Sequence, residues 1–232
     1  MDRHPQSMKP WLLEILACPI DKHYPLDLSI FSIEDADAFL KKVGNVDEMK
    51  KDLSFFFKNG LDDEEGDVST PIINFDDAGK DLLVFDTLVR KPSPAGLYLE
   101  KIQTSIDELK PVVVLCSEKV KETVTTLRAL KENVQEAREA VSKMAGNPAK
   151  QREIISSLEK GLILLNWFKQ AVEIESGVMI CAKCHRWCPI RDSIPQMLPD
   201  ELRREKYDKQ FLETWKDKMD PDIVNAGIPF HL

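Results

Sequence analysis

The stretch Val178–Leu202, VMICAKCHRWCPIRDSIPQMLPDEL, contains three of the five cysteines of this 232-residue chain. A smaller version of its cysteine motif, LLEILACPIDKHYPL, lies at Leu12–Leu26, close to the other end of the chain. Between them the apolar residues mostly follow helical spacing. This arrangement predicts that both ends of the chain meet in one small domain, with a helical insertion between them.

The cysteine pattern predicts a metal site made from both ends of the chain. Cys181-Ala-Lys-Cys184 has the CxxC spacing that lets two thiolates bind one ion, and Cys18-Pro-Ile-Asp21 repeats that spacing with a carboxylate as its second group. Zinc takes four tetrahedral ligands, and carboxylate oxygen is among those it accepts. The predicted shell is therefore Cys18, Asp21, Cys181 and Cys184. Three nearby residues compete for the fourth position: Cys188, His185 and His23.

Other interpretations of the cysteines stay open at this stage. One is that the cysteines are small buried residues without a metal. Another is that Cys181 and Cys184 form a redox pair, although no thioredoxin-like βαβ pattern surrounds them. Catalytic zinc is disfavoured because the chain has neither HExxH nor a deaminase motif. The sequence also lacks the common phosphate-loop and nucleophile motifs. We therefore predict a structural zinc ion and no enzyme activity.

Both chain ends have short apolar alternations that predict strands. Tyr24–Phe31 is a predicted strand, and a short helix precedes it at Lys9–Leu16. After Ala171 we expect a hairpin that turns at Ser176-Gly177, and then a short strand within Trp187–Leu198. A helix near Pro199–Met219 and an extended tail complete this part.

The central part of the chain has helical periodicity. The clearest prediction is an antiparallel helical hairpin that runs from Val120 to Phe168 and turns at Gly146-Asn147-Pro148. Leu61–Asp67 is an acidic run that we interpret as a loop. The other expected helices are Ser32–Val43, Asn45–Lys58, Lys80–Val89 and Pro94–Leu109. Val112–Cys116 fits either a buried strand or the start of a helix, and we interpret it as helix.

These elements together predict an α+β fold. A small zinc-ribbon-like α/β domain is expected from residues 8–31 plus 171–232, and a large all-helical insertion domain from residues 32–170. The formal net charge of −8 disfavours unaided binding of nucleic acid. The chain has no apolar run long enough for a membrane span, its first seven residues have no signal-peptide core, and its cysteines suit metal chemistry. We therefore expect a cytoplasmic protein without membrane contact.

The two cysteine-bearing ends resemble a known family. WLLEILACPID near the start and CAKCHRWCPIRDSIPQMLPDELR near the end are similar to the small zinc-binding activator subunit of S-adenosylmethionine-dependent methyltransferases, the tRNA methyltransferase activator subunit family. The resemblance implies a non-catalytic subunit that activates and stabilises methyltransferases of tRNA, rRNA or a translation release factor. It implies that the chain itself binds no S-adenosylmethionine and contacts RNA only through its partner.

The resemblance also implies which residues bind zinc and the partner. Zinc ligands fall on Cys18, Cys181 and Cys184, and the remaining position, a cysteine in most members, falls on or close to Asp21. Cys188 stands where an aromatic residue is usual and is a candidate substitute ligand. The implied partner surface, which also has the alternation of an apolar edge strand, comprises Pro189, Ile190, Arg191, Asp192, Ile194, Pro195, Met197 and Leu198.

The alternative function is a zinc-ribbon protein that binds nucleic acid directly. A basic strip near the cysteines supports it, and salt-dependent RNA affinity of the isolated chain would distinguish it from the activator subunit. The strip has acidic residues among its basic ones, which is also the pattern of a solvated helix face. Its basic residues are Lys183, His185, Arg186, Arg191, Arg203, Arg204 and Lys206.

Overall fold

The computed structural model describes residues 7–58, 72–78 and 81–232, and the chain forms two compact units. We call Met1–Ala36, Pro111–Lys121 and Val172–Leu232 the terminal unit, and Asp37–Lys110 and Glu122–Ala171 the central unit. Both units contain helices and strands, which confirms the predicted α+β class. That residues 8–31 plus 171–232, and residues 32–170, fold as separate domains stays a prediction.

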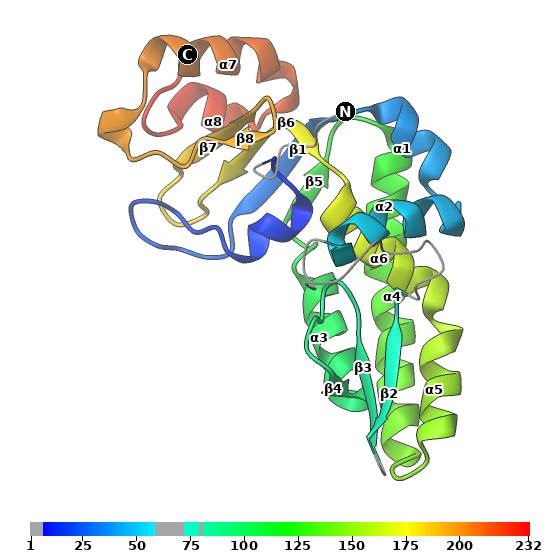
Figure 1. Ribbon diagram of the computed structural model, residues 1–232. Helices are drawn as coiled ribbons and strands as arrows, with labels where there is room; N and C mark the ends of the chain where they lie inside the picture. Colours follow the sequence, from blue (N-terminus) through cyan, green and yellow to red (C-terminus); the bar gives the residue numbers. More distant parts are fainter. Residues whose placement is uncertain (1–6, 59–71, 79–80) are drawn as a thin grey trace. The chain divides into compact units, whose positions relative to one another are not determined.

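A five-stranded sheet in the order β5-β1-β6-β7-β8 forms the framework of the terminal unit (Figure 1). Its strands are β1 (Asp27–Ile33), β5 (Val112–Val114), β6 (Ile174–Ile180), β7 (Trp187–Arg191) and β8 (Ile194–Pro195). Strand β1 pairs with β5 in parallel and with β6 in antiparallel orientation, and β6, β7 and β8 continue antiparallel. Because β1 comes from the start of the chain and β6 from its end, the sheet joins the two cysteine-bearing pieces.

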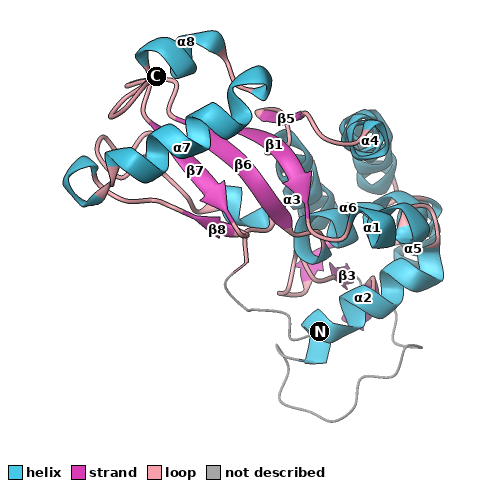
Figure 2. Cartoon of the chain, turned by 90° about the horizontal axis from the view of Figure 1, so that it is seen from above, coloured by secondary structure: helices cyan, strands magenta, loops and turns pink. Residues whose placement is uncertain are grey.

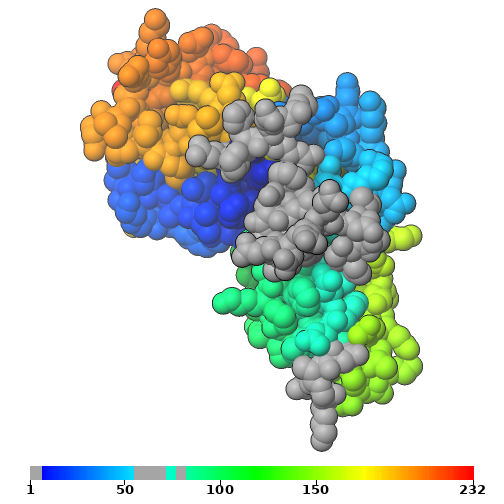
Figure 3. Space-filling model, viewed as in Figure 1, coloured from blue at the N-terminus to red at the C-terminus, as the bar shows by residue number. Residues whose placement is uncertain are grey.

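Two helices from the end of the chain, α7 (Glu205–Trp215) and α8 (Pro221–Ala226), cover one face of this sheet (Figure 2). Apolar side chains from the helices and from the sheet fill the space between these two layers, among them Phe31, Trp187 and Phe211. In the space-filling view, N-terminal residues in blue pack directly against C-terminal residues in orange (Figure 3). Burial of this apolar surface stabilises the contact between chain ends that are far apart in sequence. Three short 3₁₀ helices complete the unit: η1 (Pro10–Glu14), η2 (Asp200–Leu202) and η3 (Lys216–Lys218).

The central unit combines helices with a second, three-stranded sheet. Its helices are α1 (Ala36–Lys42), α2 (Val46–Lys58), α3 (Ala95–Asp107), α4 (Glu118–Lys143), α5 (Pro148–Ser157) and α6 (Glu159–Ala171). The antiparallel sheet has the order β2-β3-β4, with β2 (Asn74–Ala78), β3 (Asp81–Phe85) and β4 (Ser93–Pro94). None of the helices in the described part of the chain is long and apolar enough to cross a membrane.

The predicted helical hairpin is present with the expected chemistry at its turn, although its second arm is divided into α5 and α6 at Leu158. Helix α4 ends before Gly146, which has a φ of +75°, a conformation that favours glycine. The side chain of Asn147 then caps α5 by accepting a hydrogen bond of 3.1 Å from the amide of Lys150. Proline at the next position starts α5, where its missing N–H has no cost.

The prediction that the insertion is all helical is wrong, because β2, β3 and β4 lie within it. The helix predicted at Lys80–Val89 is strand β3, in which Leu82 and Val84 are buried and Leu83 is only half-buried. That alternation has the period of a strand, and a short apolar run does not distinguish the two states. The acidic run Leu61–Asp67 lies outside the described residues, as do residues 1–6.

Four predictions for the terminal unit are also wrong in detail. The helix expected at Val112–Cys116 is strand β5, because its β-branched residues pair with β1. The hairpin expected to turn at Ser176-Gly177 is one continuous strand, β6, with a bulge against β1. The segment expected to be an extended tail contains α8, and the first helix is only a 3₁₀ turn.

Gly177 explains why a turn-like dipeptide lies inside a strand. A Cβ atom at this position would lie 2.5 Å from the backbone carbonyl oxygen of Ser29 on β1. Glycine is therefore needed for the close approach of two backbones, which is one of the roles of glycine within a sheet.

Candidate metal centre and partner-binding strand

Two loops with the same backbone course carry the predicted metal ligands. One loop follows Cys18, and the other starts at Cys181 and joins β6 to β7. In each loop the residue four positions after the cysteine donates its amide to the cysteine's carbonyl oxygen: Lys22 at 3.0 Å and His185 at 2.9 Å. These two residues also share a positive φ, 60° and 56°.

The loops agree in a second backbone hydrogen bond. The amide of each cysteine donates to the carbonyl oxygen five positions later, His23 at 3.0 Å and Arg186 at 2.8 Å. Two loops with the same bonds and the same left-handed residue place the third residue after the cysteine at the same point. Asp21 in the first loop is therefore structurally equivalent to Cys184 in the second.

The four predicted ligand atoms lie within 4.8 Å of one another, as a shared ion requires. The sulfur atoms of Cys18 and Cys184 are 3.7 Å apart, and the sulfur of Cys181 is 3.6 Å from Asp21 Oδ1. For zinc bonds of about 2.3 Å to sulfur and 2.0 Å to oxygen, tetrahedral geometry requires separations of about 3.8 Å and 3.5 Å. The residues therefore fit a zinc ion, and their arrangement shows that this cluster could hold a metal.

The charge state of the cluster also suits a cation. The amide of His23 donates to Asp21 Oδ1 at 3.0 Å and holds the pKa of this carboxyl at about 2. Burial raises the pKa of the Cys181 thiol to about 12, and burial also raises the pKa of Cys18. Without a cation these two thiols keep their protons at neutral pH. Binding of a divalent ion would release them, so metal affinity should rise with pH.

Arg186 forms hydrogen bonds with the fourth ligand, Cys184. Burial alone would raise the pKa of Cys184, but hydrogen bonds from the backbone and guanidinium of Arg186 lower it below its ordinary value. The carboxylate of Asp200 holds this guanidinium in place, with contacts of 3.1 Å to Nε and 2.9 Å to Nη2. Groups that orient a ligand in this way commonly tune metal sites.

The three predicted competitors lie outside the group of four ligand atoms. Cys188 is on β7 opposite Met179, where it is 4% exposed, and burial raises the pKa of its thiol to about 11. His23 and His185 contribute backbone groups to the two loops rather than ring nitrogens to the cluster. Asp21 completes the group of four ligand atoms, so Cys188 is not needed as a substitute ligand.

The residues of the predicted partner surface differ widely in exposure. The side chains of Pro189 and Ile190 are buried, and Ile190 is 0% exposed, so both belong to the core. Ile194 and Leu198 are 51% and 37% exposed, which is unusual for large apolar residues. Of the remaining four, Asp192 is exposed, and three are half-buried: Arg191, Pro195 and Met197.

A tight turn places the exposed part of this surface at the edge of the sheet. Asp192 and Ser193 have consecutive positive φ values of 49° and 62°, the pattern of a type I′ hairpin turn. The turn reverses the chain from β7 to β8, which is the last strand of the sheet among those described. Strand β8 therefore presents Ile194 at the edge of the sheet as far as it is described.

The contribution of the C-terminal tail had no signal in the sequence. The indole nitrogen of Trp187 donates to the carbonyl oxygen of Phe230 at 3.0 Å, and the Trp187 amide donates to Ile228 at 3.2 Å. Arg186 and Ile228 also form a parallel bridge. The tail thus holds the β7 end of the second cysteine loop through backbone groups, which leave no pattern in the side chains.

Fold and site together define an α+β protein in which a cluster of metal-ligand type joins the two chain ends beside a sheet edge with exposed apolar side chains. A family model described as Trm112p-like protein matches residues 9–193. Neither the curated proteins nor the solved structures contain a match. Because the family model covers most of the chain, the protein belongs to the Trm112p-like family, and the resemblance of its two ends is confirmed. Members of this family are accessory activator subunits of methyltransferases.

Proposed function

We propose that this chain is a non-catalytic subunit that activates and stabilises S-adenosylmethionine-dependent methyltransferases acting on tRNA, rRNA or a translation release factor. Membership of the family supports the activator role. In this proposal the chain binds no S-adenosylmethionine, contacts RNA only through its partner, and works in the cytoplasm. Its partner is a methyltransferase that forms a heterodimer with it.

The observation that carries this proposal is the exposed apolar edge at β8. Ile194 and Leu198 expose large apolar side chains beside β8, the last strand of the sheet among the described residues. An incoming segment contacts these side chains, whereas β8 offers little backbone pairing because Pro195 has no N–H and its carbonyl oxygen accepts from the Met197 amide. A partner that exposes a similar edge when alone would be stabilised, because binding to its native form shifts its folding equilibrium.

Within this proposal Cys18, Asp21, Cys181 and Cys184 bind a structural zinc ion. The two ligand pairs come from opposite ends of the chain, so the ion would join β1 and the β6–β7 loop. A structural zinc ion commonly contributes about 10–16 kcal/mol to folding. That contribution would keep the docking edge rigid in a unit with a small core.

No observation favours the nucleic-acid alternative. Three arginines of the predicted basic strip form ion pairs inside the terminal unit: Arg186 with Asp200, and Arg191 and Arg203 with the single carboxylate of Asp208. Charges neutralised in this way attract phosphate weakly.

The test is co-expression with methyltransferases from the same genome, followed by pull-down and a methylation assay. Ile194→Asp places a charge at the proposed edge and should abolish co-purification and activation. Val113→Asp is the matched control, because Val113 is 51% exposed on β5 at the opposite edge of the same sheet. Loss of binding in the control but not in Ile194→Asp would move the interface to β5. Failure of every methyltransferase to co-purify would reject the proposed function.

A further inference from the structure

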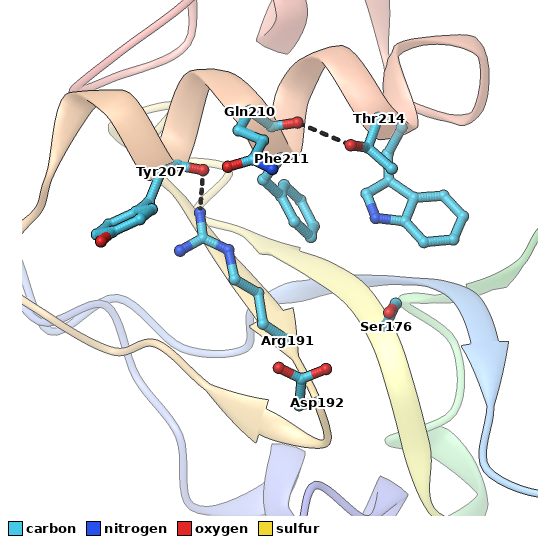
Figure 4. A pocket seen from close by; sticks show the side chains of 8 residues that line it. Ser176, Arg191, Asp192, Tyr207, Gln210, Phe211 and Thr214 are labelled. Carbon is cyan, nitrogen blue, oxygen red and sulfur yellow. Dashed lines mark hydrogen bonds between the residues drawn. The ribbon is translucent and has the colours of Figure 1, made fainter.

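A cavity of about 290 Å³ lies between helix α7 and the ends of strands β6 and β7 (Figure 4). Its floor and walls combine aromatic rings with polar groups. The lining includes Arg191, Asp192, Tyr207, Phe211, Thr214 and Trp215. The three aromatic residues are four positions apart on α7, so they lie along one face of the helix.

Arg191 supplies hydrogen-bond donors to this cavity. Its Nη2 donates to Asp208 at 2.7 Å and to the carbonyl oxygen of Tyr207 at 2.9 Å, while the guanidinium lies 5.2 Å from the ring centre of Phe211. These contacts fix the orientation of the group. In the described part of the chain, the structure records no partner for Nε or Nη1 of Arg191. Three N–H groups thus stay available.

Asp192 supplies an acceptor near the backbone end of the Arg191 side chain, away from its guanidinium (Figure 4). Its carboxylate lies next to the Arg191 side chain (Figure 4), yet among the described residues it takes part in no recorded ion pair or hydrogen bond. The backbone of Asp192 is left-handed, with a φ of 49°, and this sets the direction of its Cα–Cβ bond at the β7–β8 turn. An oriented donor and an acceptor therefore line the same cavity.

We propose that this cavity binds an amide group of the partner methyltransferase, either a main-chain peptide or the side chain of Asn or Gln. The amide oxygen accepts from Arg191, and the amide N–H donates to Asp192. The inference rests on the proposed function and extends its interface. A partner segment that contacts Ile194 on β8 reaches the cavity because Asp192 begins the turn that leads into that strand.

A nucleobase also presents an amide-like edge, but the charges favour a protein ligand. The chain has a net charge of −8. Arg191, the only arginine among the lining residues, is already paired with Asp208. A single-stranded nucleic acid needs a positively charged track for its phosphates in addition to an aromatic platform.

Affinity for a co-purifying methyltransferase tests this inference with three variants of the full chain. Thr214→Phe fills the cavity from an exposed position, and Asp192→Gly removes the acceptor while it keeps the left-handed turn. We expect each variant to raise the Kd about tenfold, the effect of losing a hydrogen bond to a charged group or the space for the amide. Glu213→Phe, at the neighbouring exposed position of α7 outside the cavity lining, should stay within about twofold of the unchanged chain.

The outcomes separate this inference from the proposed function. If the unchanged chain binds no methyltransferase, the proposed function and the cavity inference both fail. If it binds one and both cavity variants stay within twofold, the cavity inference is rejected and the proposed function stands. Titration with a fluorescent single-stranded RNA tests the other candidate ligand, a nucleobase. Weaker RNA binding by Thr214→Phe, with an unchanged Kd for the methyltransferase, would reject the amide and assign the cavity to RNA.

Discussion

Asp208→Asn should destabilise the terminal unit more than any exposed substitution, because one carboxylate balances two guanidinium groups. Asp208 is 4% exposed as a side chain and lies 2.7 Å from Arg191 Nη2 and 2.9 Å from Arg203 Nε. The side chain of Arg203 is 3% exposed, and its guanidinium lies 4.4 Å from the ring centre of Trp187. Asparagine keeps the shape of the side chain but leaves both cations without a counter-charge.

The expected loss follows from the burial of the three groups. Removing one partner of a buried ion pair costs about 3–5 kcal/mol. Arg191 is 28% exposed, so water screens part of its charge. We therefore place the cost at the lower end, about 3 kcal/mol in the free energy of unfolding of the terminal unit.

Amide hydrogen exchange of peptides from β6 and β7 measures this loss within the terminal unit alone. Glu205→Gln is the control, since it removes an exposed pair with Lys209 and should change stability by less than about 0.5 kcal/mol. The double variant Asp208→Asn with Arg203→Met should recover part of the loss, because it removes the stranded buried cation. A loss below about 1 kcal/mol for Asp208→Asn would refute the claim that this carboxylate balances both arginines.

Three further predictions concern the metal site, pH and backbone packing. Asp21→Cys should bind zinc more tightly than the unchanged chain and Asp21→Ala more weakly, as competition with a chromophoric chelator would show; equal affinity in Asp21→Ala would remove Asp21 from the ligand set. A hydrogen bond with Glu173, together with burial, raises the pKa of Glu34 from 4.5 to about 7. Between these pH values the folded state binds one more proton than the unfolded state. The stability that Glu34 contributes is therefore fully present below pH 4.5 and is lost as pH rises through about 7. Urea unfolding at pH 5.5 and pH 8 checks this, and Glu34→Gln should abolish the difference. Gly177→Ala should cost about 1–3 kcal/mol because its Cβ would meet the β1 backbone, whereas Gly96→Ala, a helical site with open space, should not destabilise the chain in thermal melts.

Local sequence patterns predicted the features that local physics controls. The CxxC spacing and its Cys18–Asp21 counterpart identified all four residues of the cluster, since a knuckle needs only a few consecutive residues. The long apolar stripe of α4 and the Gly146-Asn147 turn were equally readable, because helix periodicity and capping involve neighbours in sequence. Short apolar runs such as Leu82–Phe85 and Val112–Val114 were misread, because their state depends on the strands they pair with.

The candidate interface shows the same division. The sequence identified an apolar segment after the cysteines, but it did not show which of its residues are exposed. In the structure Ile190 lies in the core, and Ile194 lies exposed at the sheet edge. The ion pair between Arg191 and Asp208 and the bonds of Trp187 to the tail could not be read from the sequence. Each of these contacts joins residues 16 or more positions apart without a spacing rule.

The sequence by itself determined which chemical groups this protein can use and which short segments present them: two knuckles, a helical hairpin and an apolar stretch after the last cysteine. Only the tertiary structure decided that the two knuckles face each other, that Asp21 matches Cys184, and that Ile194 stays outside the core. The physical reason is range. Spacing and capping act over a few residues, whereas sheet order and burial depend on pairing β1 with β6 across most of the chain.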